Sequence, residues 1–186
     1  MTDPRAALIL PGRGYGPTAP LLDYASWAAH RRGADISAVN WEHASEIVRL
    51  PDDDDSHAVC AQVEPHLDRL AALRPLVIGK SLGSHASPLA AERGLPAVWL
   101  TPLLHRSWVV DGLRASRAPF LLIGGTADEA TWRGELARSL TPHVLEVSGA
   151  DHGMFVPGPL AASAAVLGQV ATAIEQFLDE IVWPVA

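Results

Sequence analysis

The stretch "PLVIGKSLGSHA" (residues 75–86) decides how the rest of the chain is interpreted. A short apolar run leads into Gly79-Lys80-Ser81-Leu82-Gly83, which contains the only lysine of the chain. Two interpretations compete for these residues. Gly79-Lys80-Ser81 looks like the end of a phosphate-binding loop, whereas residues 79–83 also form a complete G-x-S-x-G pattern, which is typical of a serine nucleophile on a tight turn.

The surrounding residues argue against a phosphate-binding loop. The pattern G-x-x-x-x-G-K-[ST] requires a glycine at position 74, which is Arg74, and residues 75–78 are typical of a strand. Without an open glycine-rich turn, no row of backbone N–H groups can surround a phosphate. The second glycine-rich stretch, "GRGYG" (12–16), does not match G-x-G-x-x-G either. The sequence therefore disfavours nucleotide binding.

The same surroundings favour a nucleophilic serine. G-x-S-x-G is informative only between a strand and a helix, and here an apolar run precedes it and an alanine-rich stretch follows. The turn leaves no room for side chains two positions before and after Ser81. Both of these positions are glycines, Gly79 and Gly83, which have no side chain. Ser81 would then stand at the start of a helix, where the helix dipole favours developing negative charge.

Composition narrows the class of protein. The chain has 186 residues, 48% of them apolar, which predicts one globular domain spanning residues 1–186. A net charge of -7 without a basic stripe argues against nucleic-acid binding. The single cysteine, Cys60, excludes an internal disulfide and a multi-cysteine metal site, and together with the lack of a signal peptide or a long apolar run it predicts a cytoplasmic protein that does not bind membranes. The sequence leaves open a monomer or a homodimer.

Short apolar runs alternate with amphipathic stretches along the chain. We expect six strands, at 6–11, 34–41, 75–79, 96–102, 119–125 and 143–149. We expect helices at 18–33, 55–73, 81–93, 106–116, 129–140 and 159–182, with a kink or break at Pro65. Because the strands are continuously apolar, both faces of the sheet should be covered. The predicted fold class is α/β, a three-layer α/β/α sandwich around a mostly parallel sheet of about six strands.

The carboxyl ends of such strands carry the ligand-binding residues. Asp128 follows the fifth predicted strand and His152 the sixth, so both should meet Ser81 at one edge of the sheet. Serine, acid and histidine in this chain order are typical of a hydrolase triad. Other histidines and acids compete for the last two positions. His105 follows another strand, His143 opens the sixth strand at the wrong end, and Asp151 adjoins the histidine itself. Glu129 is the nearest rival of Asp128, and Asp111 is a distant one.

On these motifs the chain resembles the α/β-hydrolase superfamily. The resemblance rests on "LPGRGYG", "GKSLGS", "GGTADE" and "GADHGM", and it is greatest to small, lidless members of the dienelactone-hydrolase-like type. It implies a minimal fold that lacks the first two antiparallel strands of the superfamily. The common His-Gly after the first strand is replaced here by Pro11-Gly12, which leaves the subfamily and the substrate open.

The resemblance also implies roles for individual residues. The backbone N–H groups of Leu82 and Arg13 would form the oxyanion hole. Independently of the resemblance, Lys80 is expected to be the least committed position of the motif, because a complete set of serine, aspartate and histidine makes a lysine base redundant. Six residues on the same edge are expected to line the substrate pocket: Tyr15, Leu103, Leu104, Trp132, Met154 and Phe155. The predicted function is a serine esterase that acts on a small-molecule acyl substrate without metal or cofactor. The alternative is a non-catalytic binding or scaffold protein on the same fold.

Overall fold

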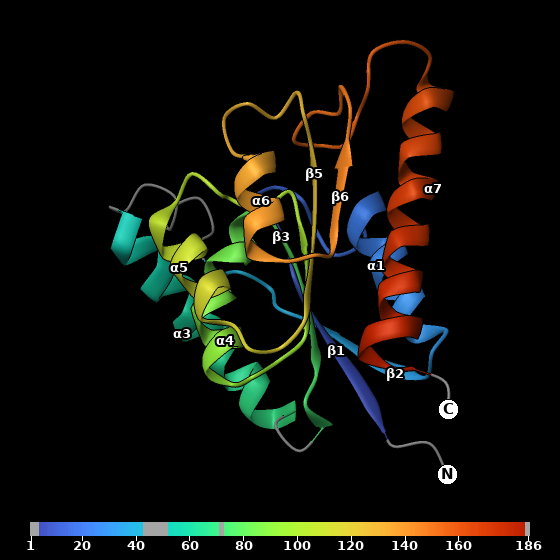
Figure 1. The fold of residues 1–186 in the computed structure, drawn as a ribbon. Helices are drawn as coiled ribbons and strands as arrows, with labels where there is room; N and C mark the ends of the chain where they lie inside the picture. The colour runs from blue at the N-terminus through green and yellow to red at the C-terminus, as the bar shows by residue number, and fades with distance from the viewer. Residues whose placement is uncertain (1–3, 43–51, 71–72, 185–186) are drawn as a thin grey trace.

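In a computed structural model, which describes residues 4–42, 52–70 and 73–184, the chain folds around a six-stranded sheet (Figure 1). The order of the strands across the sheet is β2-β1-β3-β4-β5-β6, and all five neighbouring pairs are parallel. The strands are β1 (Arg5–Leu10), β2 (Ala34–Ala38), β3 (Leu76–Lys80), β4 (Ala97–Leu100), β5 (Phe120–Gly125) and β6 (Val144–Val147). The described part of the chain thus contains no leading antiparallel strands, as the sequence predicted.

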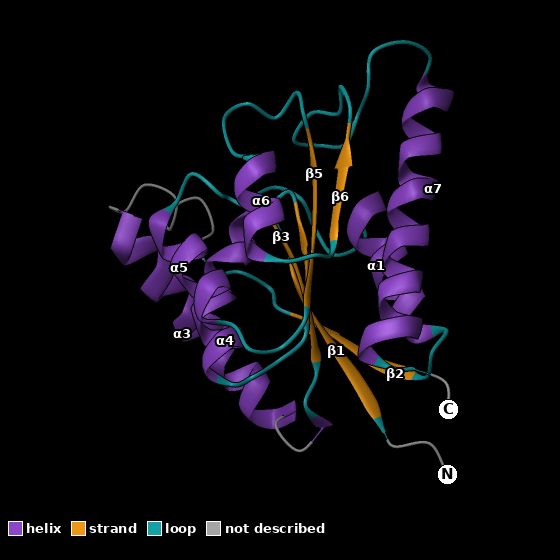
Figure 2. Cartoon of the chain, viewed as in Figure 1, coloured by secondary structure: helices purple, strands orange, loops and turns teal. Residues whose placement is uncertain are grey.

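Helices cover both faces of this sheet (Figure 2). One face carries α1 (Pro20–His30) and α7 (Leu160–Phe177). The other face carries α3 (Asp52–Leu70), α4 (Ser87–Glu92), α5 (Ser107–Ala115) and α6 (Gly134–Leu140). The three-layer α/β/α sandwich predicted from the alternation of apolar runs is confirmed.

Alternation along the strands sends side chains into two separate cores. Val77 and Trp99 belong to the core beneath α3, α4 and α5, whereas Ile78 and Val98 belong to the core beneath α1 and α7. Every residue of β3 is buried, since both faces of a parallel sheet are covered. The six strands therefore read as continuous apolar runs in the sequence.

Three helices differ from the sequence prediction. Pro65 neither splits nor ends α3, because Val59, Val63 and Leu67 pack into the core on both sides of it. The predicted helix at 81–93 is divided into a 3-10 helix, Ser81–Ala86, followed by α4. The helix predicted at 129–140 begins only at Gly134, and Arg133 is its N-cap residue.

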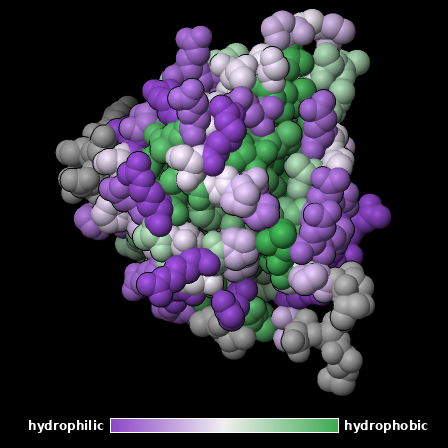
Figure 3. All heavy atoms as spheres, in the orientation of Figure 1, coloured by the Kyte–Doolittle hydropathy of each residue, from purple (hydrophilic) through white to green (hydrophobic). Residues whose placement is uncertain are grey.

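The segment Leu160–Val182 is long and apolar enough to meet the length and composition of a membrane span. One side of α7 nevertheless forms part of the core through Val166, Val170 and Ile174, and core helices of soluble proteins meet the same criterion. In the orientation of Figure 1, the β6 edge of the sheet faces the viewer, and apolar atoms reach the surface there between hydrophilic side chains (Figure 3).

Candidate active site

Ser81 lies on a tight turn at the carboxyl end of β3. Its φ is +50°, a left-handed conformation that is unfavourable for a residue with a Cβ. The residues two positions before and two positions after Ser81 have no room for a side chain. A Cβ on Gly79 would lie 2.5 Å from the Trp99 ring, and one on Gly83 would lie 2.3 Å from the carbonyl oxygen of Leu10. The glycines of the motif are therefore required by packing as well as by the turn.

His152 lies between Ser81 and Asp128. Its Nε2 is 2.9 Å from the Ser81 Oγ, and its Nδ1 is 2.6 Å from an Asp128 Oδ2. The histidine comes from the loop after β6 and the aspartate from the turn after β5, so three separate loops meet at one edge of the sheet. The His152 side chain is 38% exposed, whereas the Asp128 side chain is only 3% exposed.

Asp128 remains an acid of low pKa although it is buried. Burial alone would raise its pKa, but hydrogen bonds from His152 and Thr131 outweigh that effect and hold the pKa below its ordinary value. The Thr131 hydroxyl donates to the same Oδ2 that faces His152, and it also lies 3.2 Å from the His152 Nδ1. Sequence reasoning missed Thr131, because it lies in a segment that was expected to be helical.

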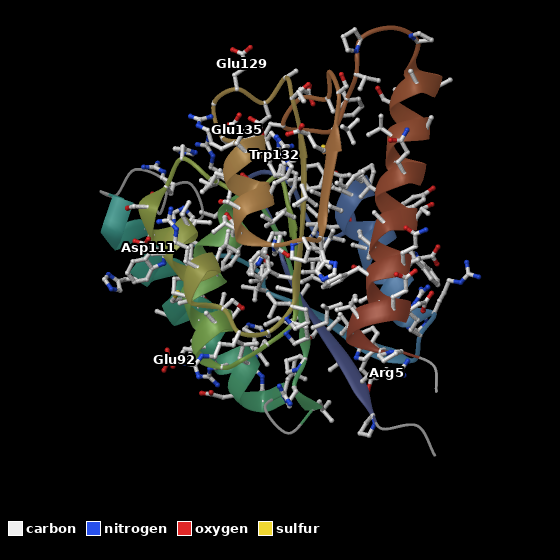
Figure 4. All side chains as sticks on the ribbon, in the orientation of Figure 1. Arg5, Glu92, Asp111, Glu129, Trp132 and Glu135 are labelled. Carbon is white, nitrogen blue, oxygen red and sulfur yellow. The ribbon has the colours of Figure 1, made fainter. Side chains whose placement is uncertain are left out.

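The competing acids and histidines lie elsewhere. Glu129 points away from the sheet and Asp111 lies on the outer side of α5 (Figure 4), where it pairs with Arg114. Asp151 accepts hydrogen bonds from the backbone N–H groups of Gly153 and Phe155, so it shapes its own loop. The ring of His143 packs edge-on against Phe177.

His105, in the segment after β4, is near enough to Asp128 and His152 for their charges to act on its pKa. Burial, with a smaller contribution from the charge of Arg133, lowers its pKa. The ring that approaches the Ser81 hydroxyl is that of His152.

The loop after β1 forms a tight turn beside the nucleophile turn. The N–H of Gly12 donates to the carbonyl of Tyr15 and the N–H of Tyr15 donates to the carbonyl of Gly12, at 3.1 and 3.3 Å. Gly14 within this turn has a φ of +66°. Arg13 stands at the tip of the turn with an exposed side chain. The assignment of its N–H, and of that of Leu82, to an oxyanion hole stays a prediction.

The six residues expected to line a pocket fall into two groups. Leu104, Trp132 and Met154 are buried in the two cores, whereas Tyr15 and Leu103 are half-buried and Phe155 is 53% exposed. The Trp132 indole (labelled in Figure 4) packs over Gly124 and donates its Nε1 hydrogen to Glu146 at 2.7 Å. Leu104 and Trp132 also border a shallow concavity of about 680 Å³ beside His105. Their role in substrate binding stays a prediction.

Lys80 was expected to be the least committed residue of the motif, and that expectation is wrong. The residue is only 3% exposed. Its Nζ donates to the Thr101 Oγ1 and to the backbone carbonyl of His152, both at 3.2 Å, and lies 4.6 Å from the centre of the Tyr15 ring. Burial lowers the Lys80 pKa to about 8, although the charges of Asp128 and Asp151 act in the opposite direction.

Known structures with the same arrangement of elements are serine hydrolases and related enzymes. XC6422 from Xanthomonas campestris, described as an α/β serine hydrolase without a lid, is 16% identical (TM-score 0.64), with 100% of this chain and 85% of that chain covered. Est1E from Butyrivibrio proteoclasticus, in its ferulic acid complex, is 13% identical (TM-score 0.69), with 97% and 91% covered. A dienelactone hydrolase from Anabaena variabilis is 19% identical (TM-score 0.63), with 96% and 88% covered.

The chain has the α/β-hydrolase fold. At these identities the likeness establishes the fold and leaves the activity to be argued from the site. No protein-family model matches the sequence, and a comparison with curated protein sequences finds no match.

Proposed function

We propose that the protein is a serine hydrolase that cleaves a small or accessible acyl ester through an acyl-enzyme intermediate. The observation that carries this proposal is the hydrogen-bonded array of Ser81, His152 and Asp128 on the carboxyl edge of the sheet, with Ser81 in a left-handed conformation. This order of side chains, on this fold, matches the geometry by which a histidine activates a serine hydroxyl.

The proposed reaction proceeds in two halves. The Ser81 Oγ attacks the ester carbonyl carbon while the His152 Nε2 takes the hydroxyl proton, and the C=O becomes a tetrahedral oxyanion. When that intermediate collapses, the ester C–O bond breaks and His152 gives the proton to the departing alcohol. Water then attacks the acyl-serine with the help of His152, releasing the carboxylic acid and restoring the Ser81 hydroxyl.

Asp128 would act on His152 rather than on the substrate. By accepting a hydrogen bond at Nδ1, it keeps the lone pair of Nε2 directed at Ser81 and stabilises the imidazolium that forms in each half-reaction. The N–H groups of Leu82 and Arg13 would donate to the oxyanion. No metal ion or cofactor takes part in these proposed steps.

Two of the known structures with a similar fold support an ester as the class of substrate. Est1E has been solved with ferulic acid bound, and a dienelactone is a cyclic ester. The site of this chain lies at an open edge, and the short segment between β4 and α5 is too small to form a large lid. We infer that esters with a short acyl group reach Ser81 most readily.

A fluorophosphonate probe tests the proposal directly. We expect labelling of the wild-type protein and loss of labelling in Ser81→Ala and His152→Ala, with p-nitrophenyl acetate hydrolysis lost in parallel. A surface histidine variant, His30→Ala, provides a matched control that should behave as wild type. Labelling that persists in Ser81→Ala would refute the assignment of Ser81 as the nucleophile. A folded wild-type protein without any turnover across a series of short p-nitrophenyl esters would instead favour a binding protein.

A further inference from the structure

We infer that Lys80 is a positioning residue that holds the main chain of His152 in place from the strand that carries the nucleophile. This inference rests on the proposed function. Lys80 takes no part in the reaction steps proposed above. Its place in the motif is also not explained by phosphate binding, which the sequence disfavours. Four residues form the Lys80 cluster, as it is called below: Lys80, Tyr15, Thr101 and His152.

The cluster joins the loops on which the proposed reaction depends. Lys80 is the last residue of β3 and directly precedes Ser81. Its three contacts come from three other segments, because Tyr15 lies in the turn with Arg13, Thr101 follows β4, and His152 follows β6. One side chain from the nucleophile strand therefore contacts the proposed oxyanion turn, the segment after β4 and the loop that carries His152.

The cost of burying Lys80 indicates that it does more than fill space. A charged ammonium is rarely buried without a carboxylate partner, because the lost hydration has to be replaced. Among the ion pairs of the described residues none involves Lys80; its Nζ contacts a carbonyl, a hydroxyl and a ring face. Burying an apolar side chain at the end of β3 would cost less free energy than burying this ammonium group.

The hydrogen bonds of the loop after β6, which carries His152, explain how a contact from Lys80 can help to hold His152 in place. Most of its hydrogen bonds are internal, since Asp151 accepts from Gly153 and Phe155 and donates its own N–H to the Phe155 carbonyl. Other bonds connect it to the turn after β5, where the N–H of Ala127 donates to Ala150. The bond from Lys80 joins the His152 main chain to the strand of Ser81, and it acts on the same residue whose ring Asp128 orients.

The ionisable groups around Lys80 come from three loops. Tyr15 faces it from the turn after β1, Asp128 from the turn after β5, and Asp151 and His152 from the loop after β6. A protonated amine donates a stronger hydrogen bond to a carbonyl than a neutral amine does. The hold on His152 should therefore weaken, without disappearing, when Lys80 loses its proton.

NMR provides a test that does not depend on turnover. Because Lys80 is the only lysine, protein made with 13Cε-lysine gives a single side-chain signal whose midpoint is the pKa of Lys80. The carbonyl carbon of His152 is observed through the amide of Gly153. We expect the two signals to titrate with one midpoint near pH 8 in the wild type, and the carbonyl signal to lose that transition in Lys80→Met.

Kinetics separates positioning from a purely structural role. In Lys80→Met we expect kcat for p-nitrophenyl acetate to fall by about 10- to 100-fold, with KM within about threefold and the melting temperature no lower than that of the wild type. Arg31→Met, which removes a distant exposed cation, is the matched control and should keep wild-type kcat. Wild-type kcat should also fall by about threefold or more as pH passes the Lys80 midpoint.

Each outcome decides a separate claim. A wild-type protein that neither binds the fluorophosphonate probe nor turns over esters contradicts the proposed function, and the NMR titration still decides whether Lys80 holds His152. Carbonyl and lysine signals with unrelated midpoints overturn the inference, as does a folded Lys80→Met variant whose kcat is within about twofold of wild type. If Lys80→Met does not fold, the wild-type titration and pH profile give the decision.

Discussion

At the scale of single residues, Thr131 tests how the buried carboxylate is supported. Its hydroxyl and His152 donate to one oxygen of Asp128, and together they hold the Asp128 pKa below its ordinary value. A hydrogen bond to a charged group contributes about 1.5–3 kcal/mol. We expect Thr131→Val to lower the free energy of unfolding by about 1–3 kcal/mol at pH 7, measured by urea denaturation.

The same substitution has a pH dependence of defined sign. A depressed carboxylate pKa contributes stability at neutral pH that is lost as pH falls through the folded pKa. Thr131→Val removes one of the lowering bonds, so the folded pKa of Asp128 rises towards its unfolded value. The acid loss of stability from this group should therefore be smaller than in the wild type and complete at a higher pH. Thr131→Ser keeps the hydroxyl and should follow the wild-type curve. Superimposable acid unfolding curves for Thr131→Val and wild type would contradict this account.

The residues that sequence reasoning misjudged depend on contacts between distant loops. The spacing of Ser81, Asp128 and His152 places each after a strand, and parallel strands bring those ends to one edge. Thr131 and Lys80 carry no such signal. Thr131 acts from a turn whose sequence resembles a helix, and the neighbours of Lys80 lie 65 or more positions before and 21 or more after it. Which way the side chain of Lys80 turns at the strand end decides its role.

At the scale of elements, two glycines with opposite surroundings provide a matched pair. A Cβ on Gly83, in the 3-10 helix after Ser81, would lie 2.3 Å from the backbone oxygen of Leu10, which cannot move without shifting β1. Gly168 lies inside α7 with nothing within 4 Å of its Cβ position. The same substitution to alanine should therefore have opposite effects at the two positions.

We expect Gly83→Ala to destabilise the protein by about 2 kcal/mol or more, because overpacking against backbone cannot relax. This corresponds to a fall in melting temperature of about 5 °C or more for a chain of this size. Gly168→Ala should raise the melting temperature by about 2 °C, because alanine is favoured over glycine by about 0.5–1 kcal/mol in a helix. Calorimetry distinguishes the two, and equal shifts in both variants would refute the packing argument.

The elements themselves were predictable where hydrophobic pattern dominates. All six strands appear at their expected places, because a strand buried on both faces leaves a continuous apolar run. Helix ends were less predictable. The start of α6 at Gly134 follows a turn in which the N–H groups of Thr131 and Trp132 donate to the Asp128 carbonyl, so the site replaces the first turns of the expected helix. Pro65 stays inside α3 because packing on both sides outweighs its local cost.

At the scale of the whole molecule, three groups with perturbed pKa values, buried Lys80 and half-buried Cys60 and Tyr15, affect the alkaline stability in opposing directions. Burial lowers the pKa of Lys80 from 10.5 to about 8. Burial, helped by the charges of Glu64 and Glu92, raises the pKa of Cys60 from 9.0 to about 11, and burial also raises that of Tyr15. The neutral thiol of Cys60 and the neutral phenol of Tyr15 contribute stability that is lost as pH rises through their folded pKa values. Charged Lys80 instead destabilises the folded protein, and this penalty is relieved as pH rises and the lysine loses its proton.

The sign for Lys80 follows from proton binding. Between pH 8 and pH 10.5 the unfolded chain binds more protons than the folded one at this residue, so the free energy of unfolding rises with pH. The penalty is fully present below pH 8, where it amounts to about 3 kcal/mol. A protein with Met at position 80 has no such penalty, so Lys80→Met should be more stable than the wild type at neutral pH.

The difference between the two proteins isolates the lysine, because Cys60 and Tyr15 are common to both and burial raises the pKa of Tyr15 above its ordinary value of 10.0. From pH 7 to pH 9 we expect the wild-type free energy of unfolding to rise by about 1 kcal/mol relative to that of Lys80→Met, measured by urea denaturation at constant ionic strength. Arg31→Met should show no such change relative to wild type. A pH-independent difference between wild type and Lys80→Met would mean that Lys80 titrates alike in the folded and unfolded chains, and hence that it is not held in the buried cluster that contacts His152.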